Sequence, residues 1–542
     1  MRRGKLLFVI LMACILILPV HFTTSKSMEK EEIKVNVEKI NAHPSIMPQK
    51  TVAKDASHLL KPTAMPLDIP VATDETIENH PFLAVDENGN LLGAFTNEED
   101  FSEYSIVLAY SMDNGATWNP LLHTTMEGIE DYPAIDYWGN GIFYGTFQPD
   151  PTDCDGAAQY VLSLNPEDLS TLSLVYFDWT DYDQRDRQSP DIATYNDVGD
   201  ADWWYGVMVT TESSDYEDAA GENIPTFNFP DYEDSNSGWI WWWDSYPNSA
   251  HAAIDIDKSN GWLYAVWDNY NESRGEGRDI LLAIADVHDW WYQKWNISWY
   301  YLGGEEDDTY PDVAAVNGNI YIVCQADINL PGKQDIICYY SHDGGATWDM
   351  SIVAGDPAKD EMYPSIVAYG DSATCIYSVD GNLFVTHTTD GGATWSEPKQ
   401  INDEDESVSM EYRDTYITNG GNVIWSDIRN GNNDVYYDSV GLPPSAIINI
   451  ESISGGLGVK ATVSNTGTAA AENVPWSIDV SGGIVLLGKH AEGTITSLNP
   501  GESATIKDFV IGFGKVTVTV KVGSVTKTAS GFLLGPLAIG LK

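Results

Sequence analysis

The chain repeats a short hydrophobic pattern in which a proline precedes alternating apolar positions. Five copies fit the pattern x-Pro-x-Ile/Val/Leu, and two looser copies keep the alternation. The seven copies are HPFLAV at 80, YPAIDY at 132, SPDIAT at 189, AHAAIDI at 250, YPDVAA at 310, YPSIVA at 363 and YRDTYI at 412. Aromatic or β-branched runs such as GIFYGTF and NIYIVCQ follow, separated by Gly, Asn and Asp. Short alternating runs bounded by such turn residues predict antiparallel strands.

The copies define a repeating unit of about fifty to sixty residues with three or four strands, which is typical of a β-propeller blade. The pattern therefore predicts an all-β propeller over residues 63–442. We count seven blades, and six to eight are compatible with the pattern because the segment 210–238 lengthens the third unit. The last unit is one strand short. A strand within 66–72 is expected to complete it and to close the ring.

A second repeat is the octet SMDNGATW at 111–118, which returns as SHDGGATW at 341–348 and TTDGGATW at 388–395. In two units the octet's aspartate follows the repeat proline by 32 residues, which places it after the third strand. The octet resembles the Asp-box of sialidases and BNR-repeat proteins. This resemblance implies a propeller in which the box folds a turn on the rim and has no catalytic role. The constrained positions are Asp113, Gly115, Thr117, Trp118, Asp343, Gly345, Thr347, Trp348, Asp390, Gly392, Thr394 and Trp395.

The composition changes after Pro443 and Pro444. Aromatic residues nearly vanish, and Val, Ile and Ala alternate with Thr, Ser and Gly. This pattern predicts a β-sandwich over residues 443–542. The stretches VSNTGTAAAENVPWSIDV and SLNPGESATIKDFVI resemble CARDB-type immunoglobulin-like modules of prokaryotic surface proteins. The resemblance implies an immunoglobulin-like domain after the propeller.

Residues 1–26 have the layout of an export signal. Basic residues precede an unbroken apolar run from Leu6 to Val20, and small polar residues follow. The run is short for a membrane span, so a signal peptide is favoured and an N-terminal anchor is the alternative. Residues 27–62 are polar and are expected to form a disordered spacer. We expect a secreted or cell-surface protein with no membrane contact beyond such an anchor.

Charge is concentrated in the middle of the chain. Residues 63–442 hold 11 Lys and Arg against 70 Asp and Glu, whereas residues 443–542 hold 7 against 6. A field of this sign repels nucleic acid and anionic lipid, and it attracts cations or basic surfaces. We therefore expect no nucleic-acid partner.

Two sets of loops are expected on one face of the propeller, around its central channel. They are the loops that enter each first strand and the loops that join the second and third strands. Both sets are rich in Asp, Glu and Asn, and a Tyr recurs before the Pro of the entry loops. We predict an acidic mouth that binds a glycan or a surface protein, with tyrosines as stacking platforms. The alternative is that these turns are simply solvated and each tyrosine fills its own blade. The candidate ligand-binding residues are Asp131, Tyr132, Asp308, Tyr310, Glu361, Tyr363 and Arg413.

The same loops suggest Ca²⁺ as a structural ion. Carboxylates and carbonyl oxygens in flexible loops are the ligands that Ca²⁺ prefers. The loops follow no strict spacing motif, so the ligand set is not fixed by the sequence. The candidate metal-binding residues are Asp268, Asp327, Asp427 and Asp434.

The Asp-box resemblance also raises the alternative of a glycoside hydrolase of sialidase-like architecture. Sialidases use a tyrosine nucleophile with a glutamate partner, an aspartate, and three arginines that clamp the substrate carboxylate. This chain lacks the early Arg-Ile/Leu-Pro motif of that family, and no arginine occurs between Arg3 and Arg185. An acidic domain also repels sialic acid. We therefore favour an extracellular binding or adhesion role, with the hydrolase as the alternative.

Overall fold

The computed structural model describes most of the chain from residue 68 onward. The predicted export signal and spacer, residues 1–62, lie outside the described residues. Within the described part, no helix is long and apolar enough to cross a membrane. The described residues are 68–100, 103–123, 130–139, 141–148, 158–163, 173–177, 186–195, 205–213, 224–231, 237–242, 248–270, 277–287, 297–303, 307–328, 332–443, 446–467, 469–523 and 525–541.

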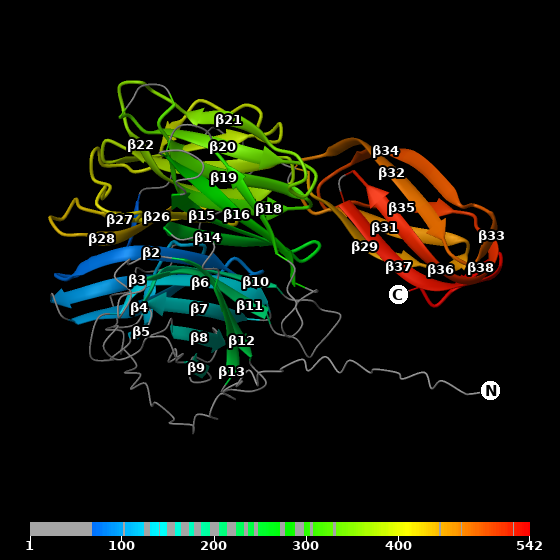
Figure 1. Ribbon diagram of the computed structural model, residues 1–542, viewed down its shortest axis with the longest axis horizontal. Coiled ribbons are helices and arrows are strands. Elements are labelled where there is room, and N and C mark those ends of the chain that lie inside the picture. The colour runs from blue at the N-terminus through cyan, green and yellow to red at the C-terminus, as the bar shows by residue number, and fades with distance from the viewer. Residues whose placement is uncertain are drawn as a thin grey trace, which may run out of the picture. The chain divides into compact units, whose positions relative to one another are not determined.

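Seven four-stranded antiparallel sheets occupy the described residues up to 443 (Figure 1). Their number equals the number of repeat units counted in the sequence. The first four sheets are β2 (Ile77–Val85), β3 (Leu91–Asp100), β4 (Glu103–Ser111), β5 (Asn119–His123); β6 (Asp131–Gly139), β7 (Ile142–Gln148), β8 (Ala158–Ser163), β9 (Ser173–Phe177); β10 (Asp186–Tyr195), β11 (Tyr205–Ser213), β12 (Ile224–Asp231), β13 (Ser237–Trp242); and β14 (Ser249–Asp257), β15 (Trp262–Tyr270), β16 (Arg278–Asp286), β17 (Ser298–Leu302). The other three are β18 (Asp308–Val316), β19 (Asn319–Ala326), β20 (Asp335–Ser341), β21 (Asp349–Ala354); β22 (Glu361–Tyr369), β23 (Ser372–Val379), β24 (Asn382–Thr388), β25 (Lys399–Gln400); and β26 (Thr415–Thr418), β27 (Asn422–Asp427), β28 (Asp434–Ser439), β1 (Ile69–Ala72).

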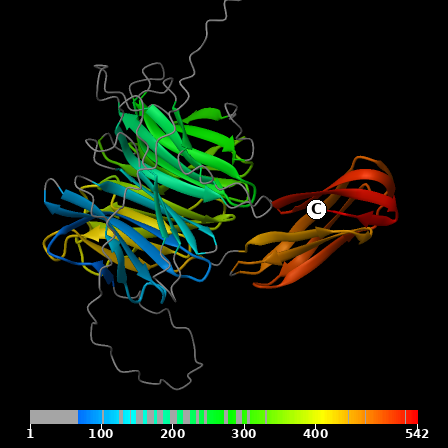
Figure 2. The same cartoon turned by 90° about the horizontal axis from the view of Figure 1, so that it is seen from below.

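The seven sheets form a closed ring, because the first and last of them lie side by side, as the blue and yellow strands of Figure 2 show. Their first strands contact one another in the order β2, β6, β10, β14, β18, β22 and β26, and β26 contacts β2. Closure of the last sheet depends on β1, which pairs antiparallel with β28 and sets Ile69 opposite Tyr437. The fourth strand of this sheet therefore comes from the other end of the propeller sequence, as the pattern at 66–72 predicted. This arrangement is a β-propeller.

Apolar side chains fill the space between neighbouring sheets. The second strands β19 and β23 are buried along their whole length, because both of their faces are covered. Between the fourth and fifth sheets, Val266 and Leu282 pack with Ile322 and Ile337 in one buried cluster. Burial of each such side chain contributes roughly 1.5–3 kcal/mol. The propeller core is thus divided among the contacts between adjacent blades.

The three Asp-boxes form the turns between the third and fourth strands of their sheets, where the sequence predicted them. Asp343 Oδ1 accepts hydrogen bonds from Ser341 Oγ (2.9 Å) and the Thr347 N–H (2.8 Å), and Oδ2 accepts one from the Thr347 hydroxyl (2.7 Å). The same bonds recur around Asp113 and Asp390. The bonds from Thr347 hold the pKa of Asp343 below its ordinary value.

The glycine of each box lies where the neighbouring blade comes close. Gly345 has φ of 89°, and a Cβ atom on it would lie 2.6 Å from Ile284 of the preceding sheet. A Cβ atom on Gly115 would lie 1.9 Å from the Tyr437 ring. Glycine is therefore required both for the positive φ and for the close approach. Each box folds its own turn and docks its blade on the blade before it.

Replacing Asp343 by alanine is expected to lower the free energy of unfolding by about 1–2 kcal/mol, because two donors of Thr347 lose their acceptor. Thermal unfolding followed by circular dichroism measures this loss. The exposed Asp349→Ala is the matched control, with an expected change within about 0.5 kcal/mol. Ligand binding is expected to be unchanged in both variants. A loss of binding at unchanged stability would contradict the structural role of the box.

The part from residue 446 onward forms two antiparallel sheets, one of three strands and one of seven. Val459 and Val463 from the smaller sheet meet Val516 and Val520 from the larger one in a single buried cluster. Two sheets thus enclose one core, and the immunoglobulin-like CARDB assignment stays a prediction. The strands are β29 (Ile448–Ser454), β31 (Val459–Asn465) and β35 (Ser503–Asp508) in the smaller sheet, and β30 (Gly456–Leu457), β38 (Leu537–Ile539), β37 (Val525–Gly535), β36 (Ile511–Val522), β32 (Ala471–Ser481), β34 (His490–Leu498) and β33 (Ile484–Leu487) in the larger.

Candidate binding site at the channel mouth

Five residues in the first strands share an uncommon backbone conformation. His80, Tyr132, His251, Tyr310 and Tyr363 have φ between 50° and 54°. Positive φ is rare for residues other than glycine and costs on the order of 1 kcal/mol or more. At each of them the pairing with the second strand shifts by one residue, which makes a β-bulge. A bulge re-aims the side chain at its position, so five sheets present a ring at the same end of the channel.

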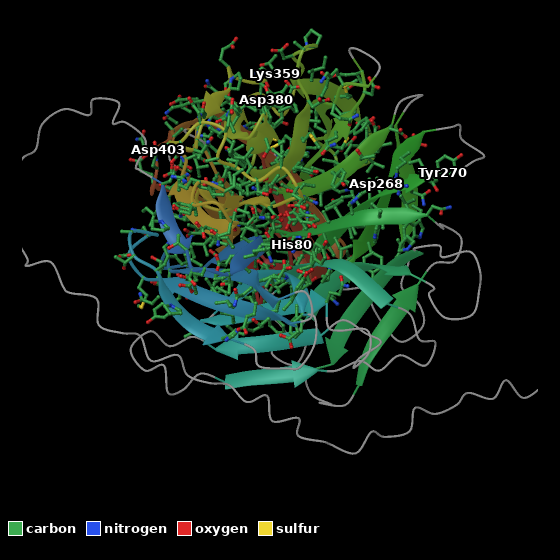
Figure 3. All side chains as sticks on the ribbon, turned by 90° about the vertical axis from the view of Figure 1, so that its left-hand side faces the viewer. His80, Asp268, Tyr270, Lys359, Asp380 and Asp403 are labelled. Atoms are coloured by element: carbon green, nitrogen blue, oxygen red, sulfur yellow. The ribbon has the colours of Figure 1, made fainter. Side chains whose placement is uncertain are left out.

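One group of rings comes from the first two sheets and from the segment that precedes β26 of the last sheet. His80 stacks on Tyr132 with ring centroids 3.9 Å apart, and Tyr412 meets the edge of His80 at 5.1 Å. Figure 3 shows His80 near the middle of the ring of sheets. Tyr412 is 40% exposed and is therefore accessible to a ligand. We call the following six residues the aromatic mouth: His80, Tyr132, His251, Tyr310, Tyr363 and Tyr412.

The second group comes from the fourth, fifth and sixth sheets. His251 stacks on Tyr310 at 3.8 Å, and Tyr310 meets the edge of Tyr363 at 5.1 Å. The two groups lie within electrostatic range of each other. The pKa of Tyr132 is raised first by burial, then by nearby carboxylates and also by Tyr310. Three of the tyrosines predicted from the entry loops thus belong to one site.

Two carboxylates flank His80. Its Nδ1 lies 2.8 Å from Asp131 Oδ1, and its Nε2 lies 3.7 Å from Asp414 Oδ1. Asp131 also accepts hydrogen bonds from the Thr96 hydroxyl and the Tyr132 N–H, both at 2.8 Å. Burial lowers the pKa of the imidazole, but the two carboxylates outweigh it and raise the pKa of His80 to about 9. His80 is therefore a buried cation at neutral pH, held at the centre of the site.

His251 has a carboxylate partner on the second strand of its own sheet. Its Nδ1 lies 2.5 Å from Asp268 Oδ2. Asp268, which the sequence suggested as a metal ligand, also accepts hydrogen bonds from Arg278 Nε (2.6 Å) and the Tyr310 N–H (3.1 Å). One fully buried carboxylate thus joins a histidine, an arginine and the tyrosine of the next sheet. This network fixes the stack of His251 on Tyr310.

Arg413, predicted as a ligand-binding residue, pairs with a carboxylate of the channel wall. Its Nη2 lies 3.2 Å from Asp312 Oδ1, and Asp312 Oδ2 accepts the Ile366 N–H of the next sheet at 2.8 Å. Asp191 makes the same bond to the Ile254 N–H at 2.9 Å. Burial raises the pKa of both aspartates, that of Asp191 to about 7. These carboxylates link neighbouring first strands, and Arg413 stabilises one of them.

Two other predicted ligand-binding residues lie among strands and outside the aromatic mouth. Asp308 accepts a hydrogen bond from the Tyr339 hydroxyl of its own sheet at 2.7 Å. Glu361 is buried and accepts the Asp356 N–H at 3.1 Å, and burial raises its pKa to about 6. These contacts place the two carboxylates within their own sheets, and their ligand-binding role stays a prediction. The bulge inserts a residue after Asp308 and after Glu361, so neither side chain lies on the same face of its strand as the tyrosine two residues later.

The predicted metal-binding residues of the fifth and seventh sheets also have protein partners. Asp427 receives hydrogen bonds from Arg429 Nε (2.7 Å) and Nη2 (2.6 Å). Asp434, opposite it, accepts one from Asn430 at 2.5 Å, and Asp327 accepts a backbone N–H. Among the described residues, no group of three or more His, Cys, Asp or Glu side chains could hold a metal ion. Ca²⁺ stays a prediction, and the arrangement of these carboxylates adds nothing to it.

The arginines bear on the sialidase alternative, which requires three of them around one substrate carboxylate. The side chains of residues 185, 187 and 274 lie outside the described part. Every arginine side chain that the structure does describe is ion-paired with the protein's own aspartates. These pairs are Arg278 with Asp268, Arg413 with Asp312, and Arg429 with Asp68 and Asp427.

Half of the aromatic mouth was missed from the sequence. His80, His251 and Tyr412 occupy the same repeat position as the predicted tyrosines, in the copies HPFLAV, AHAAIDI and YRDTYI. The signal in the sequence was therefore the repeat position itself, because histidine occupies it as well as tyrosine and proline does not always follow.

Comparison with known proteins finds one family model, the BNR/Asp-box repeat, over residues 339–350. No curated protein matches the chain. Among solved structures, the polysaccharide lyase Uly1 is 11% identical with a TM-score of 0.45, over 70% of this chain and 100% of that one. An α-L-arabinofuranosidase of Fusarium graminearum is 11% identical with a TM-score of 0.37, over 70% and 97%. A Trypanosoma rangeli sialidase in complex with sialic acid is 11% identical with a TM-score of 0.36, over 87% of each chain. The chain itself carries an Asp-box repeat on an all-β fold of four-stranded sheets.

Proposed function

We propose that the aromatic mouth binds a neutral glycan, on a protein that acts outside the cell. One observation carries the proposal. Five rings from the first strands of five sheets, and Tyr412 from the segment that precedes β26, gather at one end of the channel, and the five strand residues stand on strained backbone. Strain that recurs at equivalent positions is expected where it positions side chains for a function. A packing role alone would be met by unstrained aromatic residues inside the sheets.

The chemistry of the mouth suits a sugar. Aromatic faces bind the apolar faces of sugar rings, and carboxylates accept hydrogen bonds from sugar hydroxyls. Tyr412 offers an exposed ring beside Asp131, whose side chain is 13% exposed. The surrounding domain holds 11 basic against 70 acidic residues, and this field repels an anionic sugar such as sialic acid. We therefore infer a glycan without carboxylate or sulfate groups.

Catalysis through a tyrosine nucleophile gains no support from the mouth. A nucleophilic side chain is activated by a lowered pKa or an adjacent base. Burial raises the pKa of Tyr132, Tyr310, Tyr363 and Tyr412, and nearby carboxylates raise all four further. A glycoside hydrolase that works through paired carboxylates is the alternative, and hydrolysis of a bound glycan would favour it.

The test is binding to an array of neutral and sialylated oligosaccharides, followed by titration calorimetry with the best ligand. Tyr412→Ala is expected to weaken binding about tenfold, or about 1.4 kcal/mol, because it removes an exposed stacking face. The matched control is Tyr300→Ala, since Tyr300 is 43% exposed but lies on the outermost strand of the fourth sheet. Its affinity is expected to equal that of the unchanged protein.

Three results would contradict the proposal. They are the absence of binding to any neutral glycan, preference for sialylated glycans, and equal loss of affinity in the two tyrosine variants. Release of free sugar from the bound glycan would instead identify the protein as a hydrolase.

We further infer that the protein is exported and displayed at the surface. The apolar run at residues 6–20 and its basic start support export. The resemblance of residues 445–530 to CARDB-type modules supports an immunoglobulin-like role for the C-terminal sheets. Mass spectrometry of the protein recovered from the host medium or envelope tests both the location and the processing site.

A further inference from the structure

The outer face of the seven-stranded C-terminal sheet changes character along its strands. Strand pairing sets Asp479, Thr519 and Thr528 in one row across three strands, and Ser481, Thr517 and Ser530 in the next. These rows carry the polar side chains expected on a face that meets water. The inward positions between them, such as Val518, belong to the buried core.

The next two rows on the same face are apolar except for Lys515. Ile484 pairs with Phe513, Phe513 with Leu534, Leu534 with Leu537, and Leu537 with Leu457, so one row crosses five strands. All five side chains are between 44% and 65% exposed. An unbroken exposed apolar row of this length is unusual on a soluble protein.

A parallel row adds to this patch. Phe532 lies opposite both Lys515 and Ile539, and the two apolar residues are 53% and 49% exposed. We call Phe532, Ile539 and the five residues of the previous row the apolar end. Lys515 is the one charged residue paired within these two rows of the described sheet. The apolar end therefore has almost no charge to direct or repel a partner.

The size of the apolar end fits a protein interface. Seven large side chains, each about half exposed, leave on the order of 700 Å² of apolar surface, against about 300–600 Å² for the largest patch on a typical monomer. A stable interface covers about 800 Å² on each partner, of which about 60% is apolar. The apolar end can thus supply the whole apolar part of one side of such an interface.

Charge argues for a second copy as the partner. Residues 443–542 are nearly neutral, with 7 basic and 6 acidic residues, so two such domains can meet without strong repulsion. The same near-neutral domain, with 7 basic against 6 acidic residues, offers no excess of basic side chains to attract an anionic lipid surface. A sheet face with almost no charge is also self-complementary, as a two-fold interface requires.

We propose that the apolar end is the interface between two copies of this chain. The dimer presents two aromatic mouths, so binding to a surface with many identical glycans gains effective concentration beyond that of a single site. This interface is independent of what the mouth binds.

Sedimentation velocity of the full chain over a range of concentrations tests the proposal. The unchanged protein is expected to sediment as a dimer at micromolar concentration. The double variant Phe513→Ser with Leu534→Lys, at one cross-strand pair of the apolar end, is expected to weaken dimerisation at least about 100-fold. The matched control changes another cross-strand pair on the same face and strands, with Thr519→Ser and Thr528→Lys, and is expected to remain dimeric.

Circular dichroism and thermal unfolding establish that both double variants fold, because all four positions face outward. A monomeric unchanged protein at every concentration would overturn the proposal, as would a dimer that survives in the apolar-end variant. Flotation with vesicles of phosphatidylcholine, alone and with phosphatidylglycerol, examines the other occupant. Vesicle binding that only the apolar-end variant loses would assign the surface to lipid and overturn the dimer.

Discussion

Raising the pH from about 5.5 to about 8 is expected to destabilise the protein strongly. Burial raises the pKa of four carboxyl groups, Glu78, Asp191, Asp255 and Asp438, to about 7 each. The folded state therefore keeps protons that the unfolded chain has already released above about pH 4–5. His80 acts in the same direction, because its two carboxylates raise its pKa to about 9.

The sign is the same for all five groups. For each carboxyl group, the free energy of unfolding falls as the pH rises from the group's ordinary pKa toward about 7, because only the folded state still holds the proton. The ion pair of His80 contributes fully to stability below about pH 6.5, and this contribution is lost as the pH rises through about 9. Over the pH range in which a group is protonated in the folded state and deprotonated in the unfolded state, the free energy of unfolding changes by about 1.4 kcal/mol per pH unit. Denaturant unfolding at fixed ionic strength measures the slope.

Glu78→Gln isolates one of these groups. Glu78 is buried, and Gln keeps an oxygen for the Thr76 hydroxyl that donates at 2.8 Å. The variant is expected to be more stable than the unchanged protein at about pH 8 and to lose less stability between about pH 5.5 and 8. Glu87→Gln removes the same charge at an exposed site and is expected to leave the slope unchanged. Stability that rises with pH, or an unaltered slope in Glu78→Gln, would refute this account.

Removing the guanidinium of Arg429 is the second change with a large expected effect. Arg429 Nη2 lies 2.6 Å from Asp68 Oδ2 and 2.6 Å from Asp427 Oδ2, and both carboxylates are almost fully buried. Its guanidinium also lies 4.1 Å from the Tyr436 ring. Arg429→Met is expected to cost about 3–5 kcal/mol, because two buried carboxylates lose their partner.

Lys359→Met is the control for Arg429→Met. Lys359 and Asp380 form a pair at 3.5 Å at the outer edge of the propeller, and both side chains are largely exposed (Figure 3). Loss of such a pair costs less than about 1 kcal/mol. Equal unfolding midpoints in guanidinium chloride for the two variants would show that Arg429 does not stabilise the last sheet.

Much of the fold follows from local signals in the sequence. The proline-led strands, the turn residues and the three octets mark the blades, because each blade repeats the same short-range chemistry. The closing strand was predictable for the same reason, since the last unit lacked one strand. The number of strands in each C-terminal sheet was not predictable, because the alternation of apolar and polar residues identifies a strand but not the strands with which it pairs.

The site was only partly predictable, because strict alternation fails at the bulges. Asp308 and Tyr310 are two residues apart and would point to the same side of a regular strand. The extra residue at the bulge sends them to different places, and no residue type in the sequence announces a positive φ for tyrosine or histidine. The pairings of Arg278, Arg413 and Arg429 with aspartates also depend on neighbouring strands and sheets that the sequence alone does not bring together.

The closing strand also constrains the order in which the chain can fold. Arg429 and Asp68 lie 361 residues apart, so the last blade cannot be completed until nearly the whole propeller has been synthesised. Forming a contact of such long range requires the closure of a long loop, which costs conformational entropy. Folding that depends on such contacts is slow. Until then β28 presents an open strand edge, which invites pairing with other chains. An exported chain would thus emerge with its ends unjoined, and the time between the first and last blades is when it is most prone to aggregate.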